Sequence, residues 1–200
     1  MNPEQKQSIE AIFAAADEDL YGYIAELCKR HLKQYPDDGA AWVEYGRALT
    51  ELSRFEEGKS ALTQALQLSD QENHYSAFVF MARIHYRRSN YLEAEKYFLK
   101  ASELNPDNIG IHSYLGICAF RRGELKVAEE HCYRALECDN DESEKIQDEI
   151  SFNLGGILVA QERYEEAANH YRQALALGFK SAQLGLTDIE NIQKLIQQDL

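Results

Sequence analysis

Three small residues recur along this chain at a fixed spacing, and this repeat constrains the fold more than any other feature. Within each set the steps are 12 and 7 residues, and between sets they are 36, 34 and 39 residues. A period near 34 residues is typical of a helical-repeat solenoid. We therefore expect helix pairs in which the small residue of each first helix admits the small residue of the second. The four sets are Gly46, Gly58 and Ala65; Ala82, Ala94 and Ala101; Gly116, Ala128 and Ala135; and Gly155, Ala167 and Ala174.

The residues around the small ones follow helical periodicity. In the first unit Trp42, Tyr45, Gly46 and Leu49 lie at i, i+3, i+4 and i+7, on one face of a helix. The second helix of the next unit reads Tyr91-x2-Ala94-x3-Phe98-x2-Ala101…Pro106.

This pattern resembles the tetratricopeptide repeat (TPR) family, in the form of a small bacterial TPR protein. The resemblance implies an all-α fold, a right-handed α-solenoid of helix-turn-helix repeats with N- and C-terminal capping helices. Three units depart from the pattern where the closing proline would fall, at Asp70, Asn140 and Phe179.

We expect one TPR domain over residues 1–200. Residues 1–38 read as a degenerate N-terminal repeat or cap, in which His31 replaces a repeat alanine. The repeats are expected at 39–72, 75–108, 109–142 and 148–181, and a C-terminal capping helix at 182–200. Glu142–Gln147 holds the extra residues before the last repeat, which extend a helix or form a bulged loop.

The net charge of −13 argues against a nucleic-acid partner, which requires a basic surface, and against an anionic membrane surface. The sequence has no run of about 20 apolar residues, so we expect no membrane-spanning helix. The N-terminus lacks the pattern of a signal peptide, so we expect a cytoplasmic protein.

No metal, cofactor or catalytic site is expected. The four cysteines form no C-x-x-C pair, and Cys132, beside His131, falls at an apolar repeat position. His85 and His112 are expected to pack as structural side chains. No nucleophile elbow, phosphate-binding loop or H-E-x-x-H motif is present, so we do not expect an enzyme.

By the same resemblance, positions 2, 5, 9, 12 and 13 of each first helix line a concave peptide-binding groove, which Phe80 and Tyr114 at position 6 border. Arginine and aromatic residues, which are enriched at binding hot spots, gather at these positions. The candidate groove residues are Arg47, Val79, Arg83, Tyr86, Arg87, Ser113, Ile117, Phe120, Arg121 and Phe152.

An alternative explains the arginines without a ligand. Arg87 and Arg121 close their helices, where a cation opposes the helix dipole, and Arg83 is able to pair within the array. The Lys/Asn clamp of TPR domains that capture chaperone C-termini is absent, because its positions hold Val43, Arg47, Phe80, Gly110 and Tyr114.

The sequence thus predicts a protein-interaction module that binds an extended, acidic and hydrophobic segment of a partner protein. In this hypothesis Arg83, Arg87 and Arg121 hold carboxylates, while Tyr86, Phe120 and Phe152 receive apolar side chains. The alternatives are a secretion chaperone for an exported client, or a scaffold that self-associates, for example as a homodimer through a terminal helix.

Overall fold

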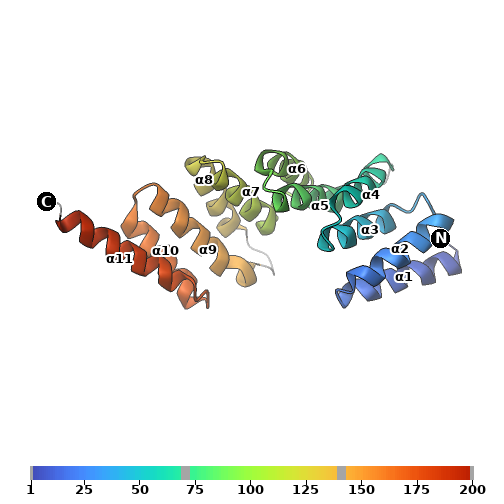
Figure 1. Ribbon diagram of the computed structural model, residues 1–200, viewed down its shortest axis with the longest axis horizontal. Coiled ribbons are helices and arrows are strands. Elements are labelled where there is room, and N and C mark those ends of the chain that lie inside the picture. The colour runs from blue at the N-terminus through green and yellow to red at the C-terminus, as the bar shows by residue number, and fades with distance from the viewer. Residues whose placement is uncertain (1, 69–72, 139–142, 199–200) are drawn as a thin grey trace. The chain divides into compact units, whose positions relative to one another are not determined.

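A computed structural model describes residues 2–68, 73–138 and 143–198 (Figure 1). Over these residues the chain forms eleven α-helices and no strand. The helices fall into two compact units, residues 1–105 and 106–200, and each unit is described by itself. The all-α fold expected from the repeat is confirmed. None of the described helices is both long and apolar enough to cross a membrane.

The first unit is a stack of three helix hairpins. Each first helix packs against its own second helix, and α2 and α4 pack against the hairpin that follows. Its helices are α1 (Pro3–Asp17), α2 (Tyr21–Gln34), α3 (Gly39–Glu51), α4 (Phe55–Gln67), α5 (His74–Arg87) and α6 (Tyr91–Leu104).

The second unit contains two hairpins followed by a last helix that packs against α10 and α9. Helix α9 has 18 residues, so residues 143–147 extend a helix, while Glu142 lies outside the described residues. Asp70 and Asn140, two of the three departures from the closing proline, also lie outside them. The helices are α7 (Ile109–Arg121), α8 (Leu125–Glu137), α9 (Ser143–Ala160), α10 (Tyr164–Ala176) and α11 (Ala182–Gln198).

Every hairpin turns in the same way. The second residue after the first helix has a positive φ, and two backbone N–H groups bond back to carbonyls of the last helical turn. In the α9–α10 turn, Glu162 N–H bonds to Val159 and Arg163 N–H bonds to Leu158, which is a Schellman motif. The residues with positive φ in these turns are Asp19, Ser53, Ser89, Gly123 and Glu162.

The glycines of the first helices admit larger residues than expected. A Cβ on Gly46 would lie 2.5 Å from the Leu62 side chain, and a Cβ on Gly155 would lie 2.6 Å from the Tyr171 ring. The small residues do approach each other as expected, since a Cβ on Gly58 would lie 3.4 Å from the Gly46 carbonyl oxygen and a Cβ on Gly116 would lie 3.2 Å from that of Ala128. The side chain that lies against each first-helix glycine, however, comes from a different position of the second helix. The space is taken by the side chain one turn further along, because that position points at the middle of the first helix.

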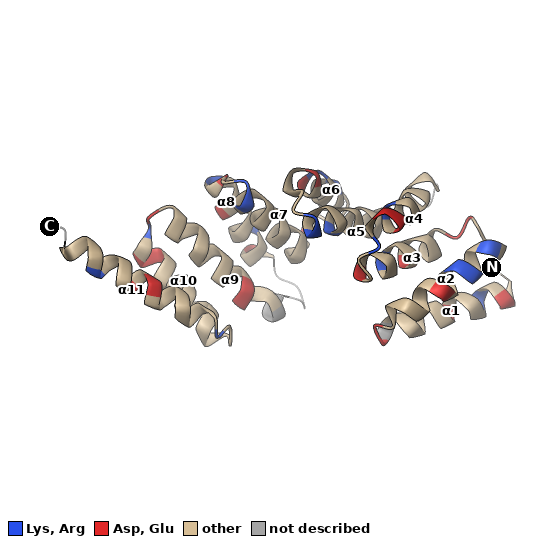
Figure 2. Ribbon diagram, viewed as in Figure 1, with Lys and Arg blue, Asp and Glu red and all other residues tan. Residues whose placement is uncertain are grey.

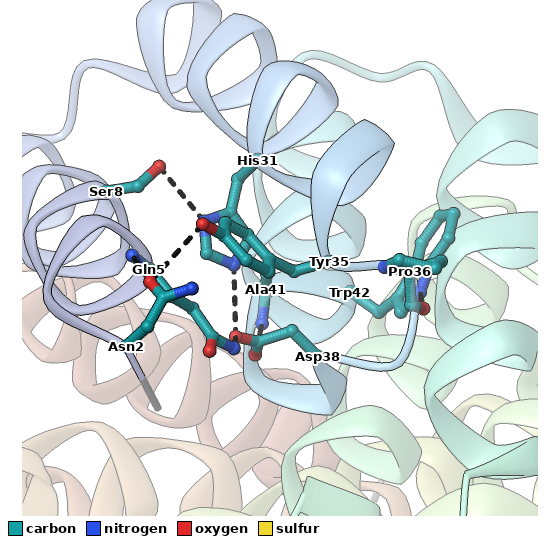
Figure 3. Close-up of polar contacts among 9 residues, drawn as sticks. All are labelled: Asn2, Gln5, Ser8, His31, Tyr35, Pro36, Asp38, Ala41 and Trp42. Atoms are coloured by element: carbon teal, nitrogen blue, oxygen red, sulfur yellow. Dashed lines mark hydrogen bonds and ion pairs between the residues drawn. The ribbon is translucent and has the colours of Figure 1, made fainter.

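At the N-terminus a polar cluster ties three helices together (Figure 3). His31 on α2 contacts Ser8 Oγ on α1 through Nδ1 and Asp38 Oδ2 through Nε2, both at 3.0 Å. Asp38 is also the N-cap of α3, because its Oδ1 accepts the backbone N–H of Ala41. The His31 side chain is completely buried. A position that holds alanine in the later repeats therefore carries a hydrogen-bonded histidine here.

Candidate functional site

The candidate arginines of the first unit lie on α3 and α5 and are paired with carboxylates. Glu51, at the end of α3, accepts from Arg83 at 2.8 Å and from Arg87 at 2.6 Å. Arg87 also donates to the backbone carbonyl of Thr50, at 2.7 Å. Arg47 pairs with Glu44, one turn earlier on the same helix, at 2.8 Å. Arg83 therefore pairs within the array, as the alternative expected, and Arg47 and Arg87 are paired as well.

One carboxylate between two guanidinium groups leaves an excess of positive charge at this place. Glu51 is nearly buried, with 13% of its side chain exposed, whereas Arg83 and Arg87 expose 30% and 35%. Both cations therefore keep N–H donors that face solvent. Elsewhere on the chain acidic and basic residues are interspersed (Figure 2).

The two other candidates of this unit are half-buried. Val79 and Tyr86 both lie on α5, and the Tyr86 ring meets the Tyr91 ring edge-on, with centroids 5.8 Å apart. Arg83 lies over the Phe80 ring, 5.5 Å from its centroid. The face of α5 that carries these residues thus combines cations with aromatic surface.

In the second unit, four candidate residues meet in one pocket between α7 and α9. The pocket has a volume of about 170 Å³ and is lined mostly by apolar side chains. Ser113, the remaining candidate, lies one turn before Ile117 on α7 and does not line the pocket. The lining residues are Ile117, Phe120, Arg121, Phe152, Asn153, Gly156 and Ile157.

The pocket offers two polar groups that the described residues do not satisfy. Arg121 is exposed at the end of α7, and no carboxylate in the described part of the chain pairs with it. The Nδ2 atom of Asn153 is buried and has no hydrogen-bond partner there. A buried amide donor without a partner carries a desolvation cost that a bound acceptor would remove. Sequence reasoning missed Asn153, although it occupies position 6, where Phe80 and Tyr114 were expected to border the groove.

One wall of the pocket belongs to an aromatic cluster. The Phe152 ring packs against Phe179, with centroids 4.6 Å apart, and against Tyr171 at 5.5 Å. Tyr171 is buried, and this burial, with a smaller effect of the Asp188 charge, raises the pKa of its hydroxyl. Tyr171 therefore acts as a neutral packing residue.

The ten candidates thus form two sets in two units. Five lie on α3 and α5, and the other five lie on α7 and α9. A single groove that holds all ten stays a prediction.

The histidines and cysteines pack as expected from their repeat positions. His85 stacks on Tyr97, with centroids 5.5 Å apart, and burial lowers its pKa. His112 is buried, and its Nε2 donates to the carbonyl of Pro106 at 2.8 Å. Burial raises the pKa of the Cys132 thiol to about 12, so the residue stays protonated. The described residues contain no group of three side chains placed to hold a metal ion.

Stacked hairpins of this kind define a helical-repeat protein. Sequence models of the tetratricopeptide repeat match residues 39–72, 75–108 and 107–178, together more than half of the chain. The chain therefore belongs to the tetratricopeptide repeat family, as the sequence pattern predicted. Proteins of this family act as scaffolds for interactions between proteins.

Curated relatives are longer than this chain. The human cell division cycle protein 16 homolog is 27% identical over 169 residues, which cover 79% of this chain and 26% of that protein. The type IV pilus assembly protein PilF of Pseudomonas aeruginosa is 29% identical over 98 residues, 49% of this chain and 37% of PilF. The matched segments thus span about a quarter of the first relative and somewhat more than a third of the second.

Solved structures share the fold at low identity. MamA from Desulfovibrio magneticus RS-1 has a TM-score of 0.75 and 16% identity, covering 88% of this chain and 96% of MamA. The Cut9–Hcn1 complex of the APC/C has a TM-score of 0.76 and 18% identity. The match covers 94% of this chain and 36% of the matched chain. YrrB, described as a TPR protein with an unusual peptide-binding site, has a TM-score of 0.71 and 16% identity. The match covers 92% of this chain and 90% of YrrB.

Proposed function

We propose that this chain binds an extended segment of a partner protein that presents an apolar side chain next to an acidic one. The observation that carries the proposal is the α7–α9 pocket, where apolar walls meet two unsatisfied donors, Arg121 and Asn153. A pocket that is mostly apolar, with a few convergent polar groups, is the usual form of a specific binding site.

The chemistry of the pocket suggests how such a segment is held. An apolar side chain of the partner fills the space between Phe120, Ile117 and Phe152. Its burial stabilises the complex by about 25 cal/mol for each Å² of apolar surface removed from water. A carboxylate of the partner accepts two hydrogen bonds from the Arg121 guanidinium, the geometry that arginine favours. Asn153 Nδ2, which is buried beside the pocket, donates to a carbonyl of the partner backbone once its amide turns towards the bound segment.

The α3–α5 arginines form a separate place for an acidic group, within the first unit. The carboxylate of Glu51 holds Arg83 and Arg87 in place, so little side-chain entropy is lost when they bind an anion. Because one carboxylate serves two cations, a second carboxylate from the partner completes the charge balance. A partner segment that binds at the α3–α5 arginines is therefore acidic, although the net charge of the chain is −13.

The experiment is a selection from a random 12-residue peptide library on the immobilised full-length protein, followed by titration calorimetry of the enriched peptides. We expect enriched peptides to carry acidic residues beside a large apolar residue. Arg121→Glu removes a charge-assisted hydrogen bond worth about 1.5–3 kcal/mol, so affinity falls by roughly 10–100-fold.

Lys126→Glu is the matched control, because Lys126 is exposed on α8, lies outside the pocket and undergoes the same change of charge. It is expected to leave the affinity nearly unchanged. Equal losses in the two variants would show that only the overall charge matters, and peptides without acidic residues would contradict the proposal.

The other expectations from the sequence keep their status. A secretion chaperone, a self-associating scaffold or homodimer, a cytoplasmic location and the absence of catalytic activity stay predictions. No feature of the described residues favours the chaperone or the scaffold over peptide binding.

A further inference from the structure

Phe179 stands where the repeat pattern places its closing proline, and the structure gives this departure a role. Its ring packs against Phe152, which forms one wall of the α7–α9 pocket. The centroids are 4.6 Å apart and the rings are tilted by 34°. Phe179 does not itself line the pocket, so any effect on a ligand passes through Phe152.

The local backbone fixes where the Phe179 ring lies. Gly178 has a φ of +110°, a conformation that glycine adopts without strain. The N–H groups of Gly178 and Phe179 bond to the carbonyls of Leu175 and Ala174, which closes α10 with a Schellman motif. The carbonyl of Phe179 then accepts the N–H of Ala182, the first residue of α11. The same residue thus ends one helix turn, starts the next helix and supports the pocket wall.

A second contact links α11 to the same cluster. The Tyr171 ring, which also packs on Phe152, lies between two glycines. A Cβ on Gly155 of α9 would lie 2.6 Å from this ring, and a Cβ on Gly185 of α11 would lie 2.5 Å from it. Helix α11 therefore rests directly on a ring that contacts the pocket wall.

We infer that Phe179 is a positioning residue for the pocket, and that docking of α11 and occupation of the pocket stabilise each other. The inference rests on the proposed function, because it concerns the same pocket. When α11 and Phe179 are in place, Phe152 is held from behind and the pocket keeps its shape. By linkage, a ligand that needs this shape stabilises docked α11 by the same factor.

The first experiment needs no ligand. 4-Fluorophenylalanine is incorporated at position 152 of the full-length protein, and its ¹⁹F resonance is recorded together with amide hydrogen exchange of α11. We expect Phe179→Ala to shift or broaden the resonance and to speed exchange in α11 by about tenfold or more. Phe179→Leu keeps a large apolar side chain and is expected to restore both readouts towards wild type.

Leu177→Ala is the matched control. Leu177 lies two residues away in the same turn but is 52% exposed, and it contributes no contact to the cluster. It is expected to leave the resonance and the exchange rates unchanged. An unchanged ¹⁹F resonance in Phe179→Ala, or an equal effect of Leu177→Ala, overturns the positioning role.

The second experiment uses 3-phenylpropionate, which joins an aromatic ring to a carboxylate, as the probe. In wild type we expect amide shifts around Phe120 and Phe152 and slower exchange in α11 when the probe is bound. Phe179→Ala should bind the probe about tenfold more weakly. If wild type shows no shifts at the pocket, the proposed function fails and the inference with it. If wild type and Phe179→Ala bind equally, the inference alone is wrong.

Discussion

Replacing His31 with alanine tests the role of the N-terminal polar cluster. The expected change in the free energy of unfolding has the opposite sign to that usual for a substitution towards a repeat consensus. The change gives α2 the residue that the later repeats carry at this position, as in Ala65 and Ala101. Matching a repeat consensus commonly stabilises a protein. The structure predicts the opposite here, because the His31 side chain is fully buried and bridges two helices to the cap of a third.

The magnitude follows from the two hydrogen bonds that are lost. The bond to the Ser8 hydroxyl involves no carboxylate and contributes about 0.5–1.5 kcal/mol, whereas a bond to a carboxylate such as Asp38 contributes about 1.5–3 kcal/mol. Asp38 keeps its bonds to Ala41 N–H and to the Gln5 amide, which limits the loss. We expect the free energy of unfolding of the first unit to fall by about 2–4 kcal/mol.

Urea denaturation followed by tryptophan fluorescence measures this change. Trp42 is the only tryptophan, and its indole N–H donates to the carbonyl of Pro36 at 2.7 Å, beside the cluster. Its emission therefore reports on the first unit, while circular dichroism reports on both. With a urea m-value of about 2 kcal/mol/M, the middle of the usual range, the midpoint should fall by roughly 1–2 M.

Ser8→Ala provides the internal control. It removes only the weaker bond, so we expect a loss of about 0.5–1.5 kcal/mol, and the double variant should be no less stable than His31→Ala. A fluorescence midpoint for His31→Ala equal to or above that of wild type would refute the reasoning. It would mean that the free energy needed to remove the His31 ring from water is at least as large as the stabilisation from its two hydrogen bonds.

Two further predictions concern the second unit. Glu162 has a φ of +63°, so Glu162→Gly should raise the free energy of unfolding by roughly 0.5–1 kcal/mol in thermal melts, while Glu162→Ala, which keeps a Cβ, should give no gain. Burial, with the charges of His112 and Arg134, lowers the pKa of His131 against a smaller opposing effect of Glu130. As the pH falls, the unfolded chain therefore takes up the His131 proton before the folded chain does. The contribution of neutral His131 to the free energy of unfolding is present above about pH 6.5 and is lost as the pH falls below that value. Urea midpoints at pH 7.5 and 5.5 should differ less in His131→Gln than in wild type, and an equal difference would contradict this assignment.

The helix hairpins were predictable because the repeat leaves little freedom. Small residues at a fixed spacing set where two helices approach. This register then assigns each of the remaining helical residues to a known face of its helix. The register also brought Ile117, Phe120, Arg121 and Phe152 to one pocket, because α7 and α9 present equivalent positions to each other.

What the sequence could not predict depends on side-chain reach between neighbouring helices. Glu51 is position 13 of its repeat, one of the positions expected to line the groove, but its pairing with Arg83 and Arg87 depends on how closely α3 and α5 pack. The His31 cluster was visible only as a missing alanine, because its partners come from positions 23 residues before it and 7 after it. Side-chain partners of this kind follow from three-dimensional distance and not from the period.

The shared hairpin turn has a consequence for how this sequence can change. Its geometry is held by two backbone hydrogen bonds and one residue with positive φ, and that residue is an aspartate, a serine, a glycine or a glutamate in different turns. Substitution at the turn thus alters stability slightly and leaves the helix angle intact. Insertion of one residue would move both N–H groups away from the carbonyls that they bond to, and so would remove the hydrogen bonds that set the direction of the second helix. The turns of this chain therefore tolerate a change of side chain but not a change of length.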